Sequence, residues 1–199
     1  DTTASSIDEL VFNTLATNVA LTIDGDANLT IVDDLPTTVN SVNASALTGK
    51  LTVSTGAVAE SATAITDLSV TGGEGNDTIT DGAGDDVVLG GDGVDTISIT
   101  TGNDNVDAGA GNDIISITGL SGADTITGGD GTDVLTITNS TTGTLTPAFT
   151  SIESIVVNTS TAFALDLTNA TDKTSLKTYN ISSTESTGDD VTLTKIASG

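Results

Sequence analysis

The chain has 199 residues, and its 28 acidic side chains face only four lysines, which gives a formal net charge of −24. It contains no His, Cys, Met or Trp. These absences exclude a Ser/His/Asp triad, a Cys/His nucleophile and zinc sites built from His or Cys. The chain also lacks the clustered positive charge that nucleic acids and anionic membranes require. The remaining ligand atoms are carboxylate, hydroxyl and amide oxygens, which suit hard cations and calcium above all.

Residues 1–71 are predicted to form a β-rich N-terminal flank. Short apolar runs separated by turn residues indicate strands near residues 9–12, 19–23, 29–32, 51–53 and 68–70. Residues 24–28 begin like an EF-hand loop, but Leu29 and Leu35 stand where that loop needs Gly and Glu. We therefore interpret this segment as a turn that could still hold one calcium ion.

Two observations bear on membranes and export. No stretch of 18 consecutive apolar residues occurs, so we predict no membrane insertion. The chain starts at Asp1 with neither Met nor a basic segment, so we expect a fragment, a processed chain or a product exported without an N-terminal signal. The lack of cysteine fits an extracellular protein that does without disulfides.

Residues 72–136 repeat with a period of nine, beginning GGEGNDTIT at 72–80. Six units follow, at 81–89, 90–98, 99–107, 108–116, 119–127 and 128–136. Position six is always Asp: Asp77, Asp86, Asp95, Asp104, Asp113, Asp124 and Asp133. Position eight is always aliphatic: Ile79, Val88, Ile97, Val106, Ile115, Ile126 and Leu135. Position four is always Gly: Gly75, Gly84, Gly93, Gly102, Gly111, Gly122 and Gly131. A flexible Gly/Asp-rich linker would not keep this aliphatic period.

The period has a physical interpretation. Six residues rich in Gly and Asp form a turn, and three residues form a strand whose central aliphatic side chain points inward. Two units make one coil, so odd and even units stack on opposite edges. Asp carboxylates and free carbonyls of neighbouring turns then surround cations. This stacking predicts roughly five calcium ions, three on the edge of the odd units and two on the other.

The candidate calcium ligands are the seven periodic aspartates together with ten turn glycines: Gly73, Gly75, Gly82, Gly84, Gly91, Gly93, Gly109, Gly111, Gly129 and Gly131. Unit 99–107 departs most from the pattern, since Ile99 and Thr100 replace two glycines, and we expect its site to be weak or empty. A two-residue insertion at 117–118 is expected to bulge a strand or disturb one ion. Most other turn acids are interpreted as solvated charges, with direct ligation as the minority alternative: Glu74, Asp81, Asp85, Asp92, Asp107 and Asp130.

Residues 137–199 are predicted to form a β-rich C-terminal flank, with strands near 152–157, 165–167, 178–181 and 191–193. All four aromatic residues lie in the flanks, and we expect them to fill the core rather than stack on a ligand: Phe12, Phe149, Phe163 and Tyr179. Seven N-x-S/T sequons occur, but we expect unmodified side chains. Position three of the repeat is too mixed for a regular threonine rank, which disfavours ice binding.

The units resemble the RTX nonapeptide, G-G-x-G-x-D-x-U-x, over about a third of the chain. Residues 39–53 and 149–155 also resemble segments of RTX-type surface-layer proteins of Gram-negative bacteria. The resemblance implies an all-β fold, a calcium-bound parallel β-roll (right-handed β-solenoid) that the β-rich flanks continue. It also implies export by a type I system through a C-terminal signal.

These observations predict a secreted structural protein, a calcium-dependent subunit of a bacterial surface layer or extracellular fibre. The expected partner is a second copy of the chain, with cell-surface polysaccharide as a possible partner through another domain. A calcium-stiffened adhesin module and the RTX tail of a larger secreted enzyme remain alternatives. We expect no catalytic residues, because no isolated carboxylate pair stands out and the H-E-x-x-H and G-x-S-x-G motifs are absent.

Overall fold

The computed structural model describes residues 18–31, 35, 39–54, 67–138, 143–159, 163–169, 178–183 and 191–194. None of these segments is a helix long and apolar enough to cross a membrane. The strands are β1 (Val19–Gly25), β2 (Leu29–Ile31), β3 (Val39–Leu47), β4 (Leu51–Ser54), β5 (Ser69–Thr71), β6 (Thr78–Thr80), β7 (Val87–Asp92), β8 (Thr96–Ile99), β9 (Asn105–Gly111), β10 (Ile114–Thr118), β11 (Thr125–Gly131), β12 (Val134–Thr138), β13 (Gly143–Leu145), β14 (Ala148–Thr150), β15 (Ser154–Thr159), β16 (Phe163–Asp166), β17 (Thr178–Ser183) and β18 (Val191–Thr194). A short 3-10 helix, η1 (Leu167–Asn169), follows β16.

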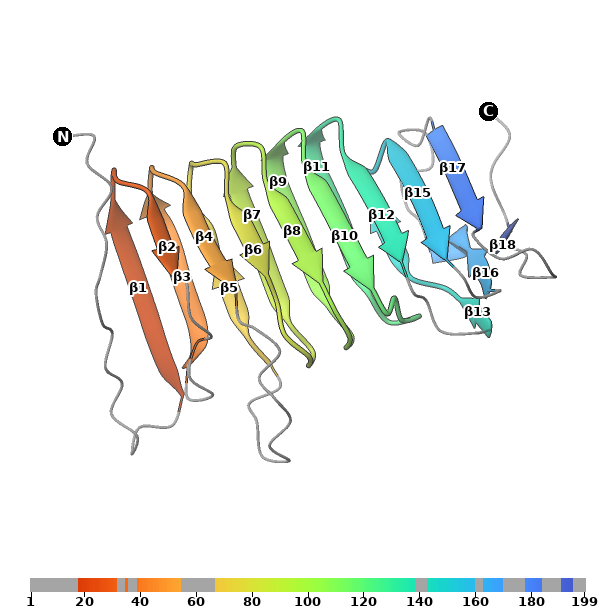
Figure 1. Ribbon diagram of the computed structural model, residues 1–199, viewed down its shortest axis with the longest axis horizontal. Coiled ribbons are helices and arrows are strands. Elements are labelled where there is room, and N and C mark those ends of the chain that lie inside the picture. The colour runs from red at the N-terminus through yellow and green to blue at the C-terminus, as the bar shows by residue number, and fades with distance from the viewer. Residues whose placement is uncertain are drawn as a thin grey trace.

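The strands stack as a β-solenoid in which every described pairing is parallel. One sheet has the order β1-β3-β5-β7-β9-β11-β14, and the other runs β2-β4-β6-β8-β10-β12-β15-β17. A third, smaller sheet contains β13, β16 and β18. Figure 1 shows the strands in a regular row, from the N-terminal coils at one end to the C-terminal strands at the other. The chain therefore alternates between the two long sheets, with a turn at each edge, as the predicted all-β parallel roll requires.

Two aliphatic ranks fill the space between the sheets. Parallel register places Val70, Val88, Val106, Ile126 and Phe149 side by side in one sheet. The other sheet aligns Val53, Ile79, Ile97, Ile115, Leu135 and Ile155 in the same way. The repeat residues of both ranks are fully buried. Each side chain of this size contributes about 1.5–3 kcal/mol when it leaves water. A single unit would leave its aliphatic residue exposed, so the coils must stack to be stable.

The flanks continue the solenoid, as predicted. Strands β1 and β3 extend the first sheet before the repeats, and β15 and β17 extend the second sheet after them. The division of the chain at 71/72 and 136/137 stays a prediction. Residues 9–12 and Phe12 lie outside the described residues, as do the side chains of Phe163 and Tyr179. Phe149 is buried in the core at 3% exposure, which fits the expected core role.

The insertion at 117–118 does not bulge its strand. Both residues extend β10 and pair in register with β12, Ile117 with Ile137 and Thr118 with Thr138. Ile117 is fully buried. The expectation of a bulge is wrong because side chains alternate with a period of two along a strand, so two added residues keep the inward and outward sets in place. The coil simply becomes longer.

Candidate metal centre

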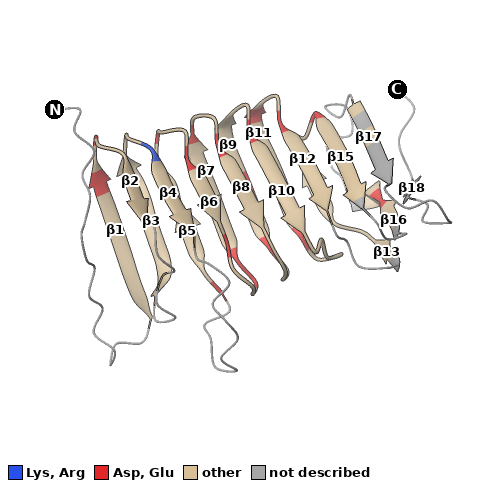
Figure 2. Ribbon diagram, viewed as in Figure 1, with Lys and Arg blue, Asp and Glu red and all other residues tan. Residues whose placement is uncertain are grey.

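The seven periodic aspartates lie at the two edges of the solenoid, each in a turn directly before a strand. Figure 2 shows acidic residues along the upper and lower edges of the view. Here the Asp77 column denotes Asp77, Asp95, Asp113 and Asp133, and the Asp86 column denotes Asp86, Asp104 and Asp124. The stacking of strands brings together the same two groups that the period predicts.

Hydrogen bonds join successive members of each column. In the Asp77 column, Oδ1 of Asp95 accepts the backbone N–H of Asp77 at 2.8 Å, and Oδ1 of Asp113 accepts that of Asp95 at 2.8 Å. Asp133 and Asp113 repeat the contact at 2.9 Å. Each carboxylate therefore reaches back to the preceding turn, and like charges stack with roughly the 4.8 Å spacing of neighbouring strands.

The Asp86 column contains the same ladder. Oδ1 of Asp104 accepts the N–H of Asp86 at 2.9 Å, and Oδ1 of Asp124 accepts that of Asp104 at 3.0 Å. Asp124 differs from the other members, because Ser121 donates its backbone N–H to Oδ2 at 2.7 Å and its hydroxyl to Oδ1 at 2.8 Å. Its oxygens are therefore better satisfied within the protein.

The turn glycines let successive turns approach closely. Gly91 has φ +111°, and a Cβ there would lie 2.2 Å from the carbonyl oxygen of Gly73. Gly109 has φ +103°, and its Cβ would lie 2.1 Å from the oxygen of Gly91. The same close stacking recurs at Gly129 on Gly109, at Gly93, Gly111 and Gly131 each on the glycine one turn earlier, and at Gly102 on Gly84. Backbone carbonyls thus fill the volume that a side chain would occupy, and they line the gap between turns.

One oxygen of most of these carboxylates has no hydrogen-bond donor. Oδ2 of Asp86, Asp95, Asp113 and Asp133 is buried and accepts no hydrogen bond from any residue that the structure describes. Asp81 has the same kind of buried, unpaired oxygen. All five residues are at most 2% exposed. Burying an ionised carboxylate without a partner is costly, so each oxygen requires either a proton or a cation.

The pKa values follow from this burial. Desolvation raises the pKa of Asp95 to about 7, and the charges of Asp77 and Asp113 add to the shift while the hydrogen bond from Asp77 opposes it. Desolvation likewise raises the pKa of Asp86, Asp104 and Asp133 to about 6. Burial also raises the pKa of Asp77 and Asp113. Burial in the protein alone therefore disfavours the ionised form of these carboxyl groups, and a divalent cation between them would stabilise that form.

A third carboxylate joins the Asp86 column. One carboxylate oxygen each from Asp81, Asp86 and Asp104 lies within 4.8 Å of the other two. Burial raises the pKa of Asp81 to about 8, and the charges of Asp86 and Asp104 contribute further. The prediction that most other turn acids are solvated does not hold for Asp81. It agrees with the exposure of the remaining five: Glu74, Asp85, Asp92, Asp107 and Asp130.

Glu153 extends the Asp77 column by one member. Its Oε2 accepts the backbone N–H of Asp133 at 2.6 Å, and the side chain is 8% exposed. The sequence contained a signal for this role, because Glu153 precedes the core residue Ile155 by two positions, as Asp133 precedes Leu135. Glu153 is not among the predicted ligands because the nonapeptide glycines are absent around it.

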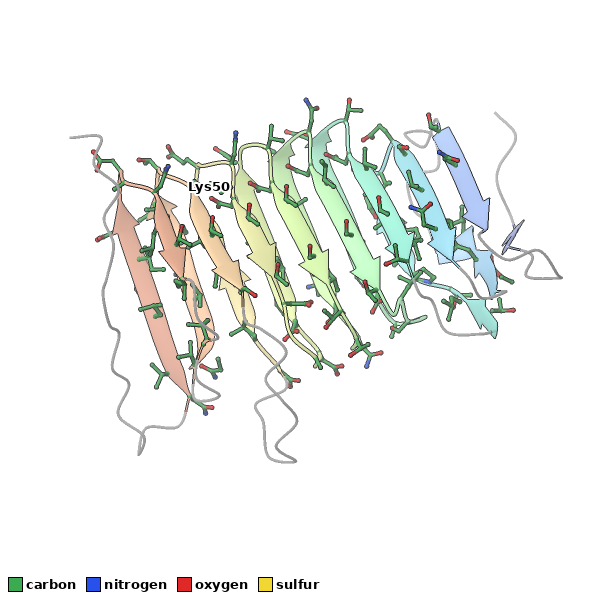
Figure 3. All side chains as sticks on the ribbon, in the orientation of Figure 1. Lys50 is labelled. Carbon is green, nitrogen blue, oxygen red and sulfur yellow. The ribbon has the colours of Figure 1, made fainter. Side chains whose placement is uncertain are left out.

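The other end of the Asp77 column carries a positive charge. On the coil before Asp77, Leu51 lies where another member of the column would stand. Its N–H donates to Oδ1 of Asp77 at 2.7 Å. Lys50 precedes it at the upper edge of the view and is the one Lys or Arg within the described residues (Figures 2 and 3). Its charge acts to lower the pKa of Asp77 against the larger effect of burial. The column thus ends at a lysine rather than at another carboxylate.

The donor set fits calcium. Calcium takes six to eight oxygen ligands in flexible geometry, and carboxylate and backbone carbonyl oxygens are its usual protein ligands. The gaps between stacked turns offer both kinds, together with the unpaired Oδ2 atoms. No imidazole or thiolate is available anywhere in the sequence to favour zinc or copper.

Comparison with known families supports the assignment of these gaps as calcium sites. The family of the RTX calcium-binding nonapeptide repeat, in four copies, matches residues 69–98, 100–116 and 116–136. Such repeats bind calcium and are typical of secreted, extracellular proteins. No curated protein and no solved structure matches the chain.

Proposed function

Since residues 69–136 of this chain belong to the RTX calcium-binding nonapeptide repeat family, we propose that it is a secreted structural protein. In this proposal it is a calcium-dependent subunit of a surface layer or extracellular fibre on a bacterial cell. The observation that supports it most strongly is the stack of buried carboxylates, several of them with an unpaired oxygen, that runs along the repeat part of the solenoid.

Calcium acts as the folding switch in this proposal. Bound between turns, it supplies the positive charge that the stacked carboxylates lack. The chain's own residues do the rest: the ladder hydrogen bonds fix each carboxylate, and the glycine turns direct carbonyl oxygens into the gaps. Calcium binds the folded form alone, so a rise in its concentration shifts the equilibrium toward folding by mass action. In a calcium-poor cytosol the acidic chain stays unfolded and ready for export.

The number of ions follows from the intervals between stacked carboxylates. Three intervals in the Asp77 column and two in the Asp86 column give about five calcium ions in the repeats. Glu153 adds a further interval after Asp133, so that site belongs to the flank.

Self-association is the proposed route to a lattice or fibre. Among the described strands, β1 and β2 are the terminal members of the two long sheets at the N-terminal end, and β14 and β17 are the terminal members at the other end. Terminal strands present backbone groups that can pair with another chain. Copies of the solenoid could therefore join end to end, with calcium bridging acidic edges.

The proposal is tested by removing calcium from the full chain. We expect EGTA at neutral pH to abolish the β-sheet signal in far-UV circular dichroism and to dissolve ordered assemblies seen by electron microscopy. Calcium should restore both, and magnesium at equal concentration should not, because magnesium demands a small octahedral shell and retains its waters. Strands and assemblies that both persist in EGTA would contradict the proposal. If folding depends on calcium but no assemblies form, calcium-dependent folding stands and the proposed lattice or fibre is contradicted.

A further inference from the structure

The second repeat unit breaks the nonapeptide pattern at its first position, where Asp81 replaces a glycine. The equivalent residues in four other units are Gly72, Gly90, Gly119 and Gly128. A Cβ at Gly72 would lie 2.0 Å from the carbonyl oxygen of Gly90 on the next coil, and one at Gly90 would lie 2.2 Å from that of Ala108. The turns at Gly72 and Gly90 thus have no room for a carboxylate side chain, so Asp81 requires a different arrangement in the neighbouring turn.

The neighbouring turn provides that arrangement. The next unit on this edge carries Ile99 and Thr100 in place of its two glycines. Thr100 donates its backbone N–H to Oδ1 of Asp81 at 2.8 Å, and its hydroxyl donates to the carbonyl oxygen of Gly82. The backbone N–H of Asp81 in turn donates to the carbonyl oxygen of Ser98 at 3.0 Å. The two departures from the repeat are therefore coupled, and together they hold the Asp81 carboxylate in place.

The held carboxylate lies close to the Asp86 column. Asp81, Asp86 and Asp104 are each 2% exposed, and an oxygen of each lies within 4.8 Å of the other two. Oδ2 of Asp81 and Oδ2 of Asp86 accept no hydrogen bond from the residues described. The one described lysine, Lys50, lies at the opposite edge of the solenoid, next to Leu51, which contacts Asp77 (Figure 3). Three carboxyl groups thus converge on one gap, and none of the described residues beside them carries a positive charge.

We propose that Asp81 is a third carboxylate ligand, which makes the gap between turns 81–86 and 99–104 the tightest cation site of the protein. This proposal rests on the proposed calcium function, and it assigns a strong site where the lost glycines of unit 99–107 predict a weak or empty one. Affinity at oxygen-ligand sites rises with the number of charged ligands. A site with three carboxylates also prefers trivalent lanthanide ions over calcium more strongly than the two-carboxylate gaps elsewhere in the columns.

The test is a titration of the full chain with calcium, by calorimetry, and with terbium, by luminescence. The variant Asp81→Asn keeps the shape and the Oδ1 acceptor but removes the charge. The second variant, Asp81→Gly, restores the glycine of the repeat. Asp130→Asn removes one charge from an exposed turn position and serves as the matched control.

In the wild-type chain we expect one site to fill first with calcium and to show the highest terbium preference. Both Asp81 variants should weaken that site by tenfold or more and lower its terbium-to-calcium preference, while the other sites stay within about threefold. Asp130→Asn should leave every site within that range. The luminescence lifetime in H2O and D2O should also show an added water on terbium in Asp81→Gly.

Three results would overturn the proposal. An unchanged tightest site in either Asp81 variant means that Asp81 is not a ligand and acts only as a neutral hydrogen-bonding group. A loss of all sites in equal measure, with circular dichroism showing an altered fold at saturating calcium, assigns Asp81 a structural role. If the wild-type chain binds no calcium at all, the proposed function fails along with this site.

Discussion

The two edges of the solenoid carry the same aspartate ladder but differ in how closely their turns follow the nonapeptide pattern. The edge of the Asp77 column keeps the second glycine of every unit, has Ala108 as its one replacement at the first position, and ends in Glu153 on one side and Lys50 on the other. The edge of the Asp86 column contains Asp81, the Ile99–Thr100 replacement and a turn in which Ser121 binds the last aspartate. One edge departs from the glycine pairs at a single residue, and the other is different at each turn.

This difference shows which parts of the repeat are interchangeable. The carboxylate ladder and the inward aliphatic residue occur on both edges, so they define the fold. The glycine pairs define only the close approach of turns, and the structure replaces them where a neighbouring side chain supplies the missing contacts, as Thr100 does for Asp81. The departures at Asp81 and Thr100 therefore form a pair whose members face each other across a coil.

The largest expected effect comes from pH in the absence of calcium. The raised pKa values mean that the folded chain binds more protons than the unfolded chain. This contribution to stability is complete below the unfolded pKa near 3.8 and is lost as the pH rises through about 6 for Asp86, Asp104 and Asp133, and about 8 for Asp81. In EGTA we expect the chain to unfold as the pH rises from about 5 to about 8, which spans these raised pKa values. Acidification should refold it.

Far-UV circular dichroism across this pH range measures the effect. With saturating calcium the dependence should reverse, because protons compete with calcium for the same oxygens. Asp81→Asn should extend the folded range in EGTA to higher pH. A calcium-free fold that becomes more stable as the pH rises would contradict the assignment of these carboxyl groups as buried and unpaired.

The next largest effect compares glycines at the same repeat position on opposite edges. Gly111 has φ +152°, and a Cβ there would lie 1.7 Å from the carbonyl oxygen of Gly93. A Cβ at Gly122 would meet nothing closer than 3.5 Å, and its φ lies outside the left-handed region. We expect Gly111→Ala to cost about 2–5 kcal/mol, from backbone strain and overlap with the next turn. Gly122→Ala should change stability by about 0.5 kcal/mol or less.

Urea unfolding in saturating calcium gives both values. Equal losses in the two variants would show that the turn at Gly122 is packed as closely as the turn at Gly111, which would remove the basis of the comparison.

The fold and the columns were predictable because both depend on local periods. A strand period of two and a unit of nine residues place Asp, Gly and aliphatic residues at fixed positions, and parallel stacking then brings equal positions together. Glu153 was harder to identify, because its environment depends on stacking beneath Asp133 rather than on neighbouring glycines. Asp81 was harder still, since its burial depends on Thr100, which is 19 residues away.

A third prediction compares aspartates of the two columns. Asp113 has a buried, unpaired Oδ2, whereas Ser121 satisfies the oxygens of Asp124. We expect Asp113→Asn to raise the calcium concentration at half-folding by more than about tenfold, because two neighbouring gaps lose a charged ligand. Asp124→Asn should raise it by about threefold or less, since it lies at the end of its column. A calcium titration followed by circular dichroism measures both, and a larger effect at Asp124 would reverse the assignment.

The smallest expected effect concerns Lys50. Its charge favours the ionised form of Asp77 at the end of the regular column. Because Lys50 is exposed, we expect Lys50→Gln to cost only about 0.2–1 kcal/mol at low salt, and less at high salt where the interaction is screened. Thermal unfolding at two salt concentrations measures this. A loss that does not depend on salt would indicate packing of the side chain rather than charge.

The central claim is that cations lie between stacked turns, against the unpaired carboxylate oxygens of both columns. Crystals of the full chain grown in calcium, with data collected at a long wavelength, test it directly through anomalous scattering. We predict anomalous peaks about 2.3–2.6 Å from the carboxylate oxygens of Asp86, Asp95, Asp113 and Asp133. Carboxylates that contact only water or protonated neighbours, with no anomalous peak in any gap, would contradict the account.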